Sequence, residues 1–436
     1  MGHLASKQSY KKLRERMDQM PVGAPGRTTI YEILKIIFTP EEAELAAKMP
    51  LAPKSLEKIA RDLKMSPDEL RPRLEAMADK GIVMDISLGG KMRYMLSPTM
   101  VGVFEFTMMR VREDVDQKKL AGLIYQYVVG ERDFVDSLNP EAQTSLFRTL
   151  IHEVTLPEDY AEVLDWEKAS HVVGEAGKWG VSLCHCRHVE HHRGNDCQKF
   201  RMESCLSIGM GADFLIRHNL AREISKSEAL DLIQETRDAG LVHICDNVQK
   251  RPTFVCNCCG CCCEILNAFK KFKIFGNTFT SNFIATPNES KCTGCRKCER
   301  ACPVDAIEKV DMPRTINGKK YRWVVKVDQE ICLGCGVCAM QCEFDSMKMV
   351  PRKQRRIAPE TTVARVMTMA LEQGKLHHYL ADMGGGATGQ VMGALAGAVL
   401  KLPPAKQLLA KETLKSRFIN FILDNARRAK VPGSDL

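Results

Sequence analysis

The sequence has few aromatic residues and no cysteine at either end. Phe, Trp and Tyr make up 6% of the 436 residues, and all 19 cysteines lie between Cys184 and Cys342. No apolar run reaches the roughly 20 residues that a membrane-spanning helix needs. The composition, 44% hydrophobic and 27% charged, is ordinary for a globular protein and excludes disordered and collagen-like classes. The length predicts about three domains.

The N-terminal residues lack the features of a secretion signal. The stretch MGHLASKQSYKKLRERMDQM is polar and charged, without an apolar core. We therefore expect a cytoplasmic, reducing location, where closely spaced cysteines serve metal or redox chemistry more often than disulfides. The net charge of +9 favours an acidic partner without requiring nucleic acid.

Residues 1–98 carry a series of helical patterns followed by a hairpin. The helical patterns cover residues 30–37, 41–49, 55–63 and 66–81, and two alternating strands meet at Gly89-Gly90. This order resembles a winged helix-turn-helix domain, which implies that residues 29–98 are where nucleic acid would bind.

The fourth helix of this series is poorly suited to DNA. Its first turn carries Asp68 and Glu69, where phosphate contacts would be made, and Pro72 is expected to kink it. We therefore expect a structural or protein-docking use of this fold rather than DNA binding.

The segments on either side of the cysteines are expected to be helical. Residues 99–180 form a helical segment with amphipathic stretches at 119–129 and 141–154, and residues 351–436 form a helical C-terminal segment. The latter begins with the basic run PRKQRR and has helical patterns at 361–373 and 406–429. Between them, an apolar run within 384–404 is too short to cross a membrane, so we expect at most peripheral membrane contact.

The strongest signal is a repeated cysteine spacing. KCTGCRKCERACPVDAI and ICLGCGVCAMQCEFDSM each show C-x2-C-x2-C-x3-C, and a thiolate at every third residue of a tight loop can bind three corners of an iron–sulfur cubane. The glycines in these loops allow a close turn around the cluster. A zinc ribbon would need only four thiolates and no triple repeat.

Residues 282–350 resemble the bacterial two-cluster [4Fe–4S] ferredoxins. In that family the fourth cysteine of each motif binds the other cluster. The resemblance implies one cluster on Cys292, Cys295, Cys298 and Cys342, and a second on Cys332, Cys335, Cys338 and Cys302. Pro303 matches the family's proline, whereas Glu343 replaces it in the second motif, which places a negative charge near one cluster and lowers its potential. The linking segment predicts a hairpin that turns at Asn317-Gly318.

Residues 181–275 form a cysteine-rich domain with further metal sites, separated into two groups by a capped helix from Ser225 to Gly240. The first group is Cys184, Cys186, Cys197 and Cys205, enough for one iron–sulfur cluster. The alternative is zinc, held by Cys184 and Cys186 with two of His188, His191, His192 and Cys197. Nearby arginine and histidine donors would raise the potential of a cluster.

The second group is the run CNCCGCCC with one upstream cysteine. Its members are Cys256, Cys258, Cys259, Cys261, Cys262, Cys263 and Cys245. Cys256, Cys259 and Cys262 repeat the cubane spacing, but spacing alone does not decide which subset binds. Spare thiolates beside a cluster are suited to disulfide-reducing chemistry.

The sequence therefore predicts an α+β multidomain fold and an iron–sulfur protein. The order of its motifs is similar to a group of multi-cluster ferredoxin-domain proteins of anaerobic bacteria, a resemblance that implies no particular reaction. We expect electron transfer through two [4Fe–4S] clusters and one or two further clusters, with redox partners that present acidic surfaces. An oxidoreductase that reduces a substrate at CNCCGCCC, and a redox-sensing transcription regulator, remain as alternatives.

Overall fold

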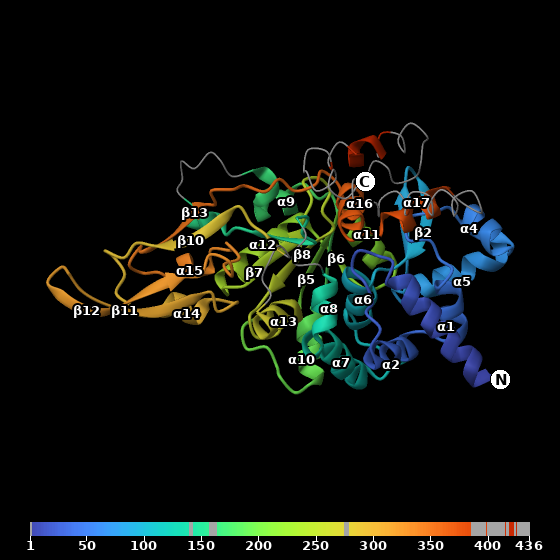
Figure 1. The fold of residues 1–436 in the computed structure, drawn as a ribbon, viewed down its shortest axis with the longest axis horizontal. Helices are drawn as coiled ribbons and strands as arrows, with labels where there is room; N and C mark the ends of the chain where they lie inside the picture. Colours follow the sequence, from blue (N-terminus) through green and yellow to red (C-terminus); the bar gives the residue numbers. More distant parts are fainter. Residues whose placement is uncertain are drawn as a thin grey trace.

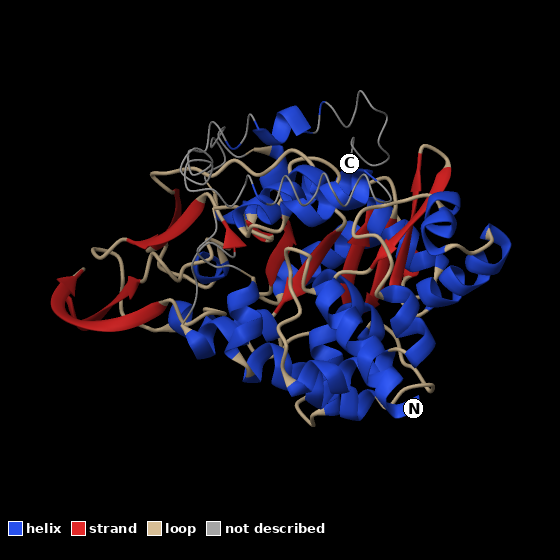
Figure 2. Ribbon diagram, turned by 45° about the vertical axis from the view of Figure 1, so that its right-hand side comes forward, coloured by secondary structure: helices blue, strands red, loops and turns tan. Residues whose placement is uncertain are grey.

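The computed structural model describes residues 2–138, 143–156, 164–273 and 279–384, together with 398, 415, 418–422 and 424. It is a mixed structure of helices and sheets (Figures 1 and 2). Helices lie on both sides of the central strands in Figure 2, and the β11–β12 hairpin projects from one end of the molecule in Figure 1.

The N-terminal part forms the predicted helices and hairpin. Its elements are α1 (Gly2–Met17), α2 (Thr28–Ile37), α3 (Pro40–Ala46), α4 (Leu56–Leu63), α5 (Pro67–Asp79), β1 (Val83–Leu88) and β2 (Lys91–Leu96). The hydroxyls of Ser55 and Ser66 accept hydrogen bonds from the amides of Lys58 and Glu69, which caps α4 and α5 as the sequence predicts. Helix α5 continues through Pro72 to Asp79.

The following segment is helical in its first half, whereas its second half combines a strand with short helices. It contains α6 (Phe104–Met108), α7 (Gln117–Tyr125), α8 (Arg132–Ser137), β3 (Phe147–Leu150) and α9 (Ala169–Gly174). The predicted helix over 141–154 is wrong, because β3 lies in its middle. All four residues of β3 are buried, and the strand pairs with neighbours on both sides. A strand buried on both faces has no polar alternation, so periodicity does not distinguish it from a helix.

A seven-stranded sheet, in the order β6-β4-β5-β8-β7-β3-β9, forms the centre of the described structure. Its remaining strands are β4 (Trp179–Leu183), β5 (Glu203–Ile208), β6 (Arg222–Ile224), β7 (Val242–Asp246), β8 (Phe254–Cys258) and β9 (Phe279–Thr280). Neighbouring strands are antiparallel except β3 and β9. The connecting helices are α10 (His185–His192), α11 (Gly209–Arg217), α12 (Lys226–Asp238) and α13 (Glu264–Phe272).

The two faces of this sheet pack against different cores. Val255 and Cys245 belong to a core with residues of α9 and α12, whereas Phe254 and Ile244 belong to the larger core that includes α2, α7 and α13. Because side chains alternate along a strand, Cys256 and Cys258 share the face of Phe254. The face that carries these thiols is therefore the one turned toward the N-terminal part of the chain.

The cysteine repeats fold into a separate pair of small sheets. The elements are β10 (Phe283–Pro287), α14 (Lys297–Ala301), β11 (Ile307–Ile316), β12 (Lys319–Val327), α15 (Val337–Met340) and β13 (Met347–Pro351). Strand β10 pairs with β13, and β11 pairs with β12. Asn317 and Gly318 both have positive φ, so the predicted tight turn is confirmed.

The C-terminal segment packs back onto the rest of the chain through α16 (Thr362–Glu372) and α17 (Leu376–Gly384). Arg365 on α16 donates to Asp246 Oδ1 at 3.0 Å, and Asp382 on α17 accepts from Arg16 and from the Leu51 amide. The predictions for residues 385–404 and for most of 406–429 lie outside the described residues. None of the described helices combines the length and apolar character needed to cross a membrane.

A buried ion cluster joins the N-terminal hairpin to α11. Arg217 Nη1 donates to both carboxylate oxygens of Asp85 on β1, at 2.9 and 2.8 Å. His218 bonds Asp85 through Nε2 at 2.8 Å and Asp79 through Nδ1 at 2.6 Å. Burial alone lowers the pKa of His218, but the bonds to Asp85 and Asp79 outweigh it and raise the pKa above its ordinary value of 6.5.

Replacing Asp85 with alanine removes the acceptor that Arg217 and His218 share. We expect the free energy of unfolding to fall by roughly 2 kcal/mol, because the buried His218 and the partly buried Arg217 lose a shared carboxylate while Asp79 and Asp213 still pair with them. Since the pKa of His218 is raised, its part of this stabilisation is complete below about pH 6.5 and is lost as the pH rises through the higher folded-state value. Denaturant unfolding should therefore show a larger effect of Asp85→Ala at about pH 6 than at about pH 9.

Glu44→Ala is the matched control, because Glu44 is exposed and pairs only with Lys48 on the surface of α3. It should change the free energy of unfolding by less than about 1 kcal/mol at either pH. An effect of Asp85→Ala that is equal at both pH values would contradict the assigned role of His218.

Candidate metal centres

The two ferredoxin-like loops depend on glycines that permit close backbone contacts. Gly294 has φ of 68°, and a Cβ there would lie 2.4 Å from Trp323 O. Gly334 has φ of 66°, and a Cβ there would lie 2.2 Å from Phe283 O. Any larger residue would be strained and would clash with the adjoining strand. Each loop therefore folds tightly against a strand, with its cysteines turned to the other side.

Four thiols from both motifs meet around Cys298. Burial raises the pKa of Cys298 to about 11, and the charges of Cys292, Cys295 and Cys342 act in the same direction. Cys295 is exposed, whereas Cys292 and Cys298 are buried. We call these four residues the distal ferredoxin group.

The remaining four thiols of the two motifs meet around Cys335. Burial raises the pKa of Cys335 to about 12, and Cys332 and Cys302 also raise it. Burial raises the pKa of Cys338 as well, with Cys335 and Cys332 as its nearest charged neighbours. We call Cys302, Cys332, Cys335 and Cys338 the proximal ferredoxin group.

Backbone amides point at the sulfur atoms of these groups. The Ala306 amide donates to Cys302 Sγ at 3.2 Å, and the amides of Ser346 and Met347 each donate to Cys342 Sγ at 3.3 Å. Such donors stabilise a sulfur that carries negative charge and tune the potential of a cluster bound to it. Together with four converging thiols in each group, they fit the chemistry of a cluster-binding loop.

Glu343, which replaces the second proline, does not present an isolated negative charge. Its carboxylate pairs with Lys297 Nζ on α14, and its side chain is 66% exposed. The ammonium group and the surrounding water both offset the carboxylate, so the influence of Glu343 on a nearby potential is smaller than the sequence alone predicts.

Six further thiols form an inner thiol group on the inward face of the central sheet. Cys205 on β5 lies beside Cys256 on β8, as the pairing of Leu206 with Val255 requires. Cys184 and Cys263 immediately precede α10 and α13. The thiol interactions form an unbroken series of Cys184, Cys186, Cys263, Cys258, Cys256 and Cys205.

Within the inner thiol group, the pKa of some thiols is lowered and that of others is raised. Contacts with Cys205 and Cys258 lower the pKa of Cys256 to about 5, despite burial. Contacts with Cys186 and Cys258 hold the pKa of Cys263 well below its ordinary value, and the amides of Ile265 and Leu266 act in the same direction. Anionic sulfur is the form that binds metal, and metal binding itself removes the proton of a thiol, so each of the six thiols is available as a ligand.

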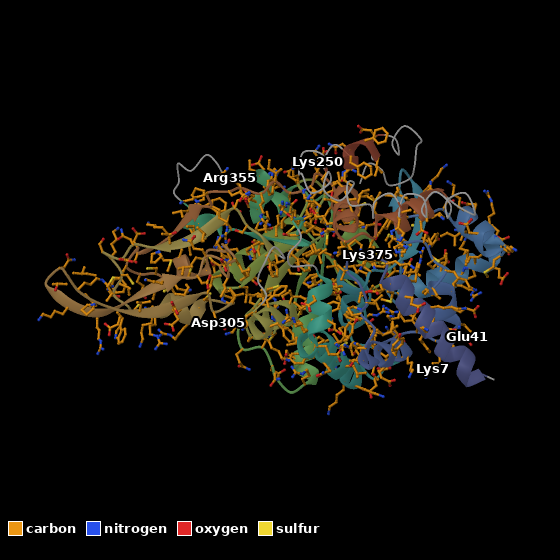
Figure 3. All side chains as sticks on the ribbon, viewed as in Figure 1. Lys7, Glu41, Lys250, Asp305, Arg355 and Lys375 are labelled. Carbon is orange, nitrogen blue, oxygen red and sulfur yellow. The ribbon has the colours of Figure 1, made fainter. Side chains whose placement is uncertain are left out.

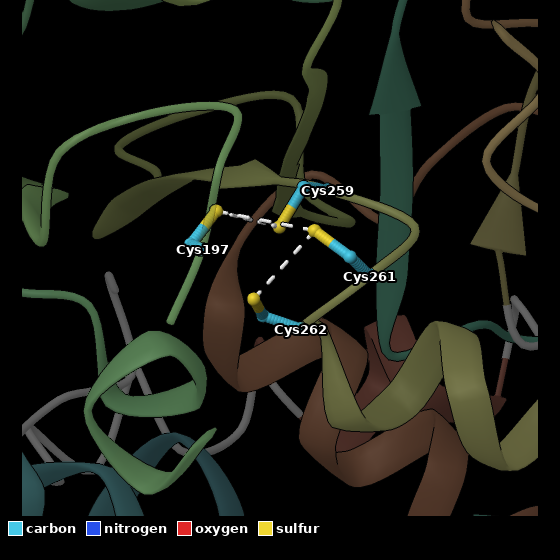
Figure 4. A group of neighbouring side chains, drawn as sticks. All are labelled: Cys197, Cys259, Cys261 and Cys262. Atoms are coloured by element: carbon cyan, nitrogen blue, oxygen red, sulfur yellow. Dashed lines mark hydrogen bonds between the residues drawn. The ribbon is translucent and has the colours of Figure 1, made fainter. Parts of the chain in front are cut away.

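Four other thiols form a second cluster beside the inner thiol group (Figure 4). Cys197 Sγ lies 3.8 Å from Cys259 Sγ and 3.9 Å from Cys261 Sγ, and Cys261 Sγ lies 3.6 Å from Cys262 Sγ. All four sulfur atoms lie within 4.8 Å of one another. We call Cys197, Cys259, Cys261 and Cys262 the four-thiol group.

This arrangement divides the cysteines differently from their order in the sequence. The predicted set of Cys184, Cys186, Cys197 and Cys205 is split, because Cys197 joins the four-thiol group. The predicted triplet of Cys256, Cys259 and Cys262 is also split, since Cys256 contacts Cys205 and Cys258 instead. Spacing along the chain could not show this, because β5 and β8 bring the two cysteine-rich segments together.

Cys245 lies apart from all these groups. It projects from β7 to the face of the sheet that carries Val255 and Leu206. Burial raises its pKa to about 12, although the nearby Arg148 acts against this. Cys245 is thus a buried neutral thiol on the far face of the sheet.

The histidines after Cys186 face away from the thiols. His188 Nδ1 lies 2.7 Å from Met108 O, and its Nε2 lies 3.2 Å from His192 Nε2. His191 Nδ1 lies 2.6 Å from Asp196 Oδ1. The zinc site that would combine these histidines with Cys184 and Cys186 therefore has no geometric support among the described residues.

Two charged residues at the inner thiol group have no special signal in the sequence. His185 Nε2 lies 2.9 Å from Glu264 Oε2, and both side chains are buried. Burial lowers the pKa of His185, but Glu264 outweighs it and raises the pKa to about 9. In the sequence, the pair is indicated only by a glutamate, Glu264, that directly follows the run of cysteines.

A cavity of about 810 Å³ adjoins the inner thiol group. Its lining includes all six inner thiols and apolar side chains of the N-terminal part and α16, among them Met100, Met109 and Met367. Most of the surface exposed to the cavity is apolar, and its polar side chains include His185, Glu105 and Arg365. An apolar chamber with a few convergent polar groups is typical of a site for an organic molecule.

The ferredoxin-like loops contact the central part of the chain at several points, two of which lie beside cysteines of the proximal group. A Cβ on Gly260 would lie 2.8 Å from Pro303 O, so the CNCCGCCC loop packs directly against the residue that follows Cys302. The amide of His152 donates to Cys335 O at 3.0 Å. Both contacts involve the proximal ferredoxin group, which therefore lies between the distal group and the inner thiols.

Comparison with known proteins gives one match. Residues 291–346 match the family model of the 4Fe-4S dicluster domain, and this stretch contains all eight cysteines of the two ferredoxin groups. No curated protein and no solved structure is significantly similar to the chain. The match and the clustered cysteines together support a ferredoxin-type, iron–sulfur domain at residues 291–346.

Proposed function

We propose that this chain transfers single electrons from a redox partner, through a ferredoxin-type domain, to a cysteine-rich centre in its interior. The observation that carries the proposal is the contact of Gly260 with Pro303, which joins the two cysteine regions. Two [4Fe–4S] clusters, one in each ferredoxin group, would supply one-electron redox chemistry. The chain itself holds the thiolates rigidly, donates amides to sulfur and fixes the separation of the groups.

Electrons would enter at the distal ferredoxin group. Cys295 is the exposed thiol of that group, so a partner can approach it closely. Basic side chains are exposed on the adjoining segments, including Lys319 and Lys320 at the hairpin tip and Lys353, Arg355 and Arg356 after β13. Figure 3 shows Arg355 on the side of β13 and Asp305 on the opposite side, near α14. A redox protein with an acidic surface would be steered to the basic side.

A second candidate function is reduction of a substrate at the inner thiol group. The 810 Å³ cavity favours it, because a simple electron carrier has no need of an apolar chamber beside its innermost thiols. A disulfide is a suitable substrate class, since its reduction to two thiols takes up two electrons and two protons. The ferredoxin groups would deliver the electrons singly. The buried His185–Glu264 pair would supply one of the two protons, and water that enters the cavity would supply the other.

Cys295→Ala should remove the distal cluster and leave the proximal one. We expect the iron content of anaerobically purified protein to fall by about four atoms per chain, because a cubane needs all four thiolates. The electron paramagnetic resonance spectrum of the reduced protein should lose one of its two coupled signals. Cys245→Ala is the control, since that thiol lies on the far face of the sheet. Unchanged iron and spectra in Cys295→Ala would refute the ligand assignment.

Gly260→Ala should slow electron transfer between the proximal ferredoxin group and the inner thiol group. The added methyl would push the loop away from Pro303, and tunnelling rates fall steeply with distance. Iron content should stay the same, while the rate of inner-centre reduction after rapid reduction of the ferredoxin domain falls severalfold. Gly122→Ala on α7, where a Cβ meets nothing within 4 Å, is the matched control. Equal rates in both variants would remove the proposed route.

The substrate-reducing candidate is tested with Cys258→Ser and a panel of low-molecular-weight disulfides. If it is right, wild-type protein with a reduced ferredoxin domain turns over a disulfide, Cys258→Ser does not, and Cys245→Ser does. A bound disulfide should also protect the inner thiols from alkylation. Absence of turnover and of protection across the panel would leave electron transfer as the function.

A further inference from the structure

The four-thiol group is distinguished by the short distances between its four sulfur atoms. Its measured sulfur separations are 3.6, 3.8 and 3.9 Å, and no pair among the four sulfurs exceeds 4.8 Å. A disulfide would need about 2.05 Å between sulfurs, so none of these pairs is bonded. The four sulfur atoms therefore form a compact cluster without a disulfide.

These separations match the edges of a tetrahedron around one metal ion. With a metal–sulfur bond of about 2.3 Å, the edge of a regular tetrahedron of sulfurs is about 3.8 Å. In an iron–sulfur cubane each thiolate binds a different iron atom and points away from the common centre. Cubane thiolates are therefore farther apart than thiolates that share a single ion. The short separations favour one shared ion over a cubane at these four residues.

The surroundings suit a metal complex with excess negative charge. Four thiolates around a divalent ion leave a net charge of about −2. Arg187 Nε donates to Cys197 Sγ at 3.3 Å, and the same guanidinium is fixed by Asn257 O at 3.0 Å. Lys270 Nζ donates to Gly260 O at 2.8 Å, within the loop that carries three of the four thiols. These two cations offset the charge that the thiolates would carry.

A metal ion here would join two segments that have no regular structure of their own. Cys197 lies in the loop between α10 and β5. Besides the contacts of Cys197 itself, this loop is bonded at its two ends, by Asn195 Nδ2 to Glu190 and by Arg201 to Glu235 of α12. Cys259, Cys261 and Cys262 lie in the turn between β8 and α13. One ion would tie the first loop to the second across 62 to 65 residues of chain, and would fix the position of Gly260 against Pro303.

From this geometry we infer that Cys197, Cys259, Cys261 and Cys262 bind one structural Zn²⁺ ion. Four protein ligands complete the coordination of zinc and leave no open position for catalysis. Among the divalent ions that accept tetrahedral thiolates, zinc binds more tightly than iron(II). The site goes beyond electron transfer, because Zn²⁺ does not change its oxidation state in proteins and cannot pass electrons on. It sets the geometry of the loop between the proximal ferredoxin group and the inner thiol group.

The inference is tested by metal analysis of protein made anaerobically in medium that contains both iron and zinc. We expect about one zinc per chain, and zinc-edge X-ray absorption should show four sulfur atoms at about 2.3 Å. The double variant Cys197→Ala, Cys261→Ala should lose at least nine-tenths of this zinc while the iron of the ferredoxin domain remains. In the variant, trypsin should cleave the exposed Lys199 site faster, because the loop is no longer tied down.

The controls keep this result separate from the proposed electron transfer. Cys245→Ala should keep its zinc, and retained iron together with an unchanged circular dichroism spectrum shows that the double variant is folded. Four results would each overturn the inference. The wild-type protein could contain no zinc, or its zinc could have nitrogen or oxygen ligands or an iron atom as a neighbour. The double variant could also retain its full zinc content. Loss of ferredoxin iron would instead bear on the electron-transfer proposal.

Discussion

Thiolates repel one another, and this chain gathers ten cysteine thiols in one region beside its central sheet. Such a cluster is stable only where positive charge compensates the sulfur atoms. The fold supplies that charge through Arg187, through a protonated His185, and through the N-termini of α10 and α13, which begin directly after Cys184 and Cys263. The sheet, the connecting helices and the cavity are all arranged around this electrostatic requirement.

The same fold separates Cys245 from the ten cysteines of the inner thiol group and the four-thiol group. Cys245 lies on β7, two strands away from Cys205 on β5. Its neighbour in the chain, Ile244, faces the inner thiols, but side chains alternate along β7, so Cys245 points into the opposite core. There it has no helix N-terminus and remains a neutral buried thiol. Placement on a strand face, rather than proximity in sequence, decides which cysteines meet one another.

The sequence allowed most of the local structure to be predicted, and the ferredoxin-type domain most clearly. Capping residues Ser55, Ser66 and Ser225, the turn at Asn317 and the two cysteine repeats act over a few residues, so their effect can be read directly. Strand β3 was missed because it is buried on both faces. The four-thiol group was missed because Cys197 meets Cys259 only after β5 pairs with β8, a long-range contact without a local signal.

The two kinds of thiol group differ in how they can be assembled. Each ferredoxin loop presents three cysteines within seven residues, so a newly made chain could capture inorganic sulfide and iron there before much of it has folded. The inner thiol group draws on β5, β8 and the starts of α10 and α13, and exists only once the sheet has formed. Any metal that the inner thiols bind must therefore enter after the sheet has formed, and the chamber that all six thiols line offers the space for it.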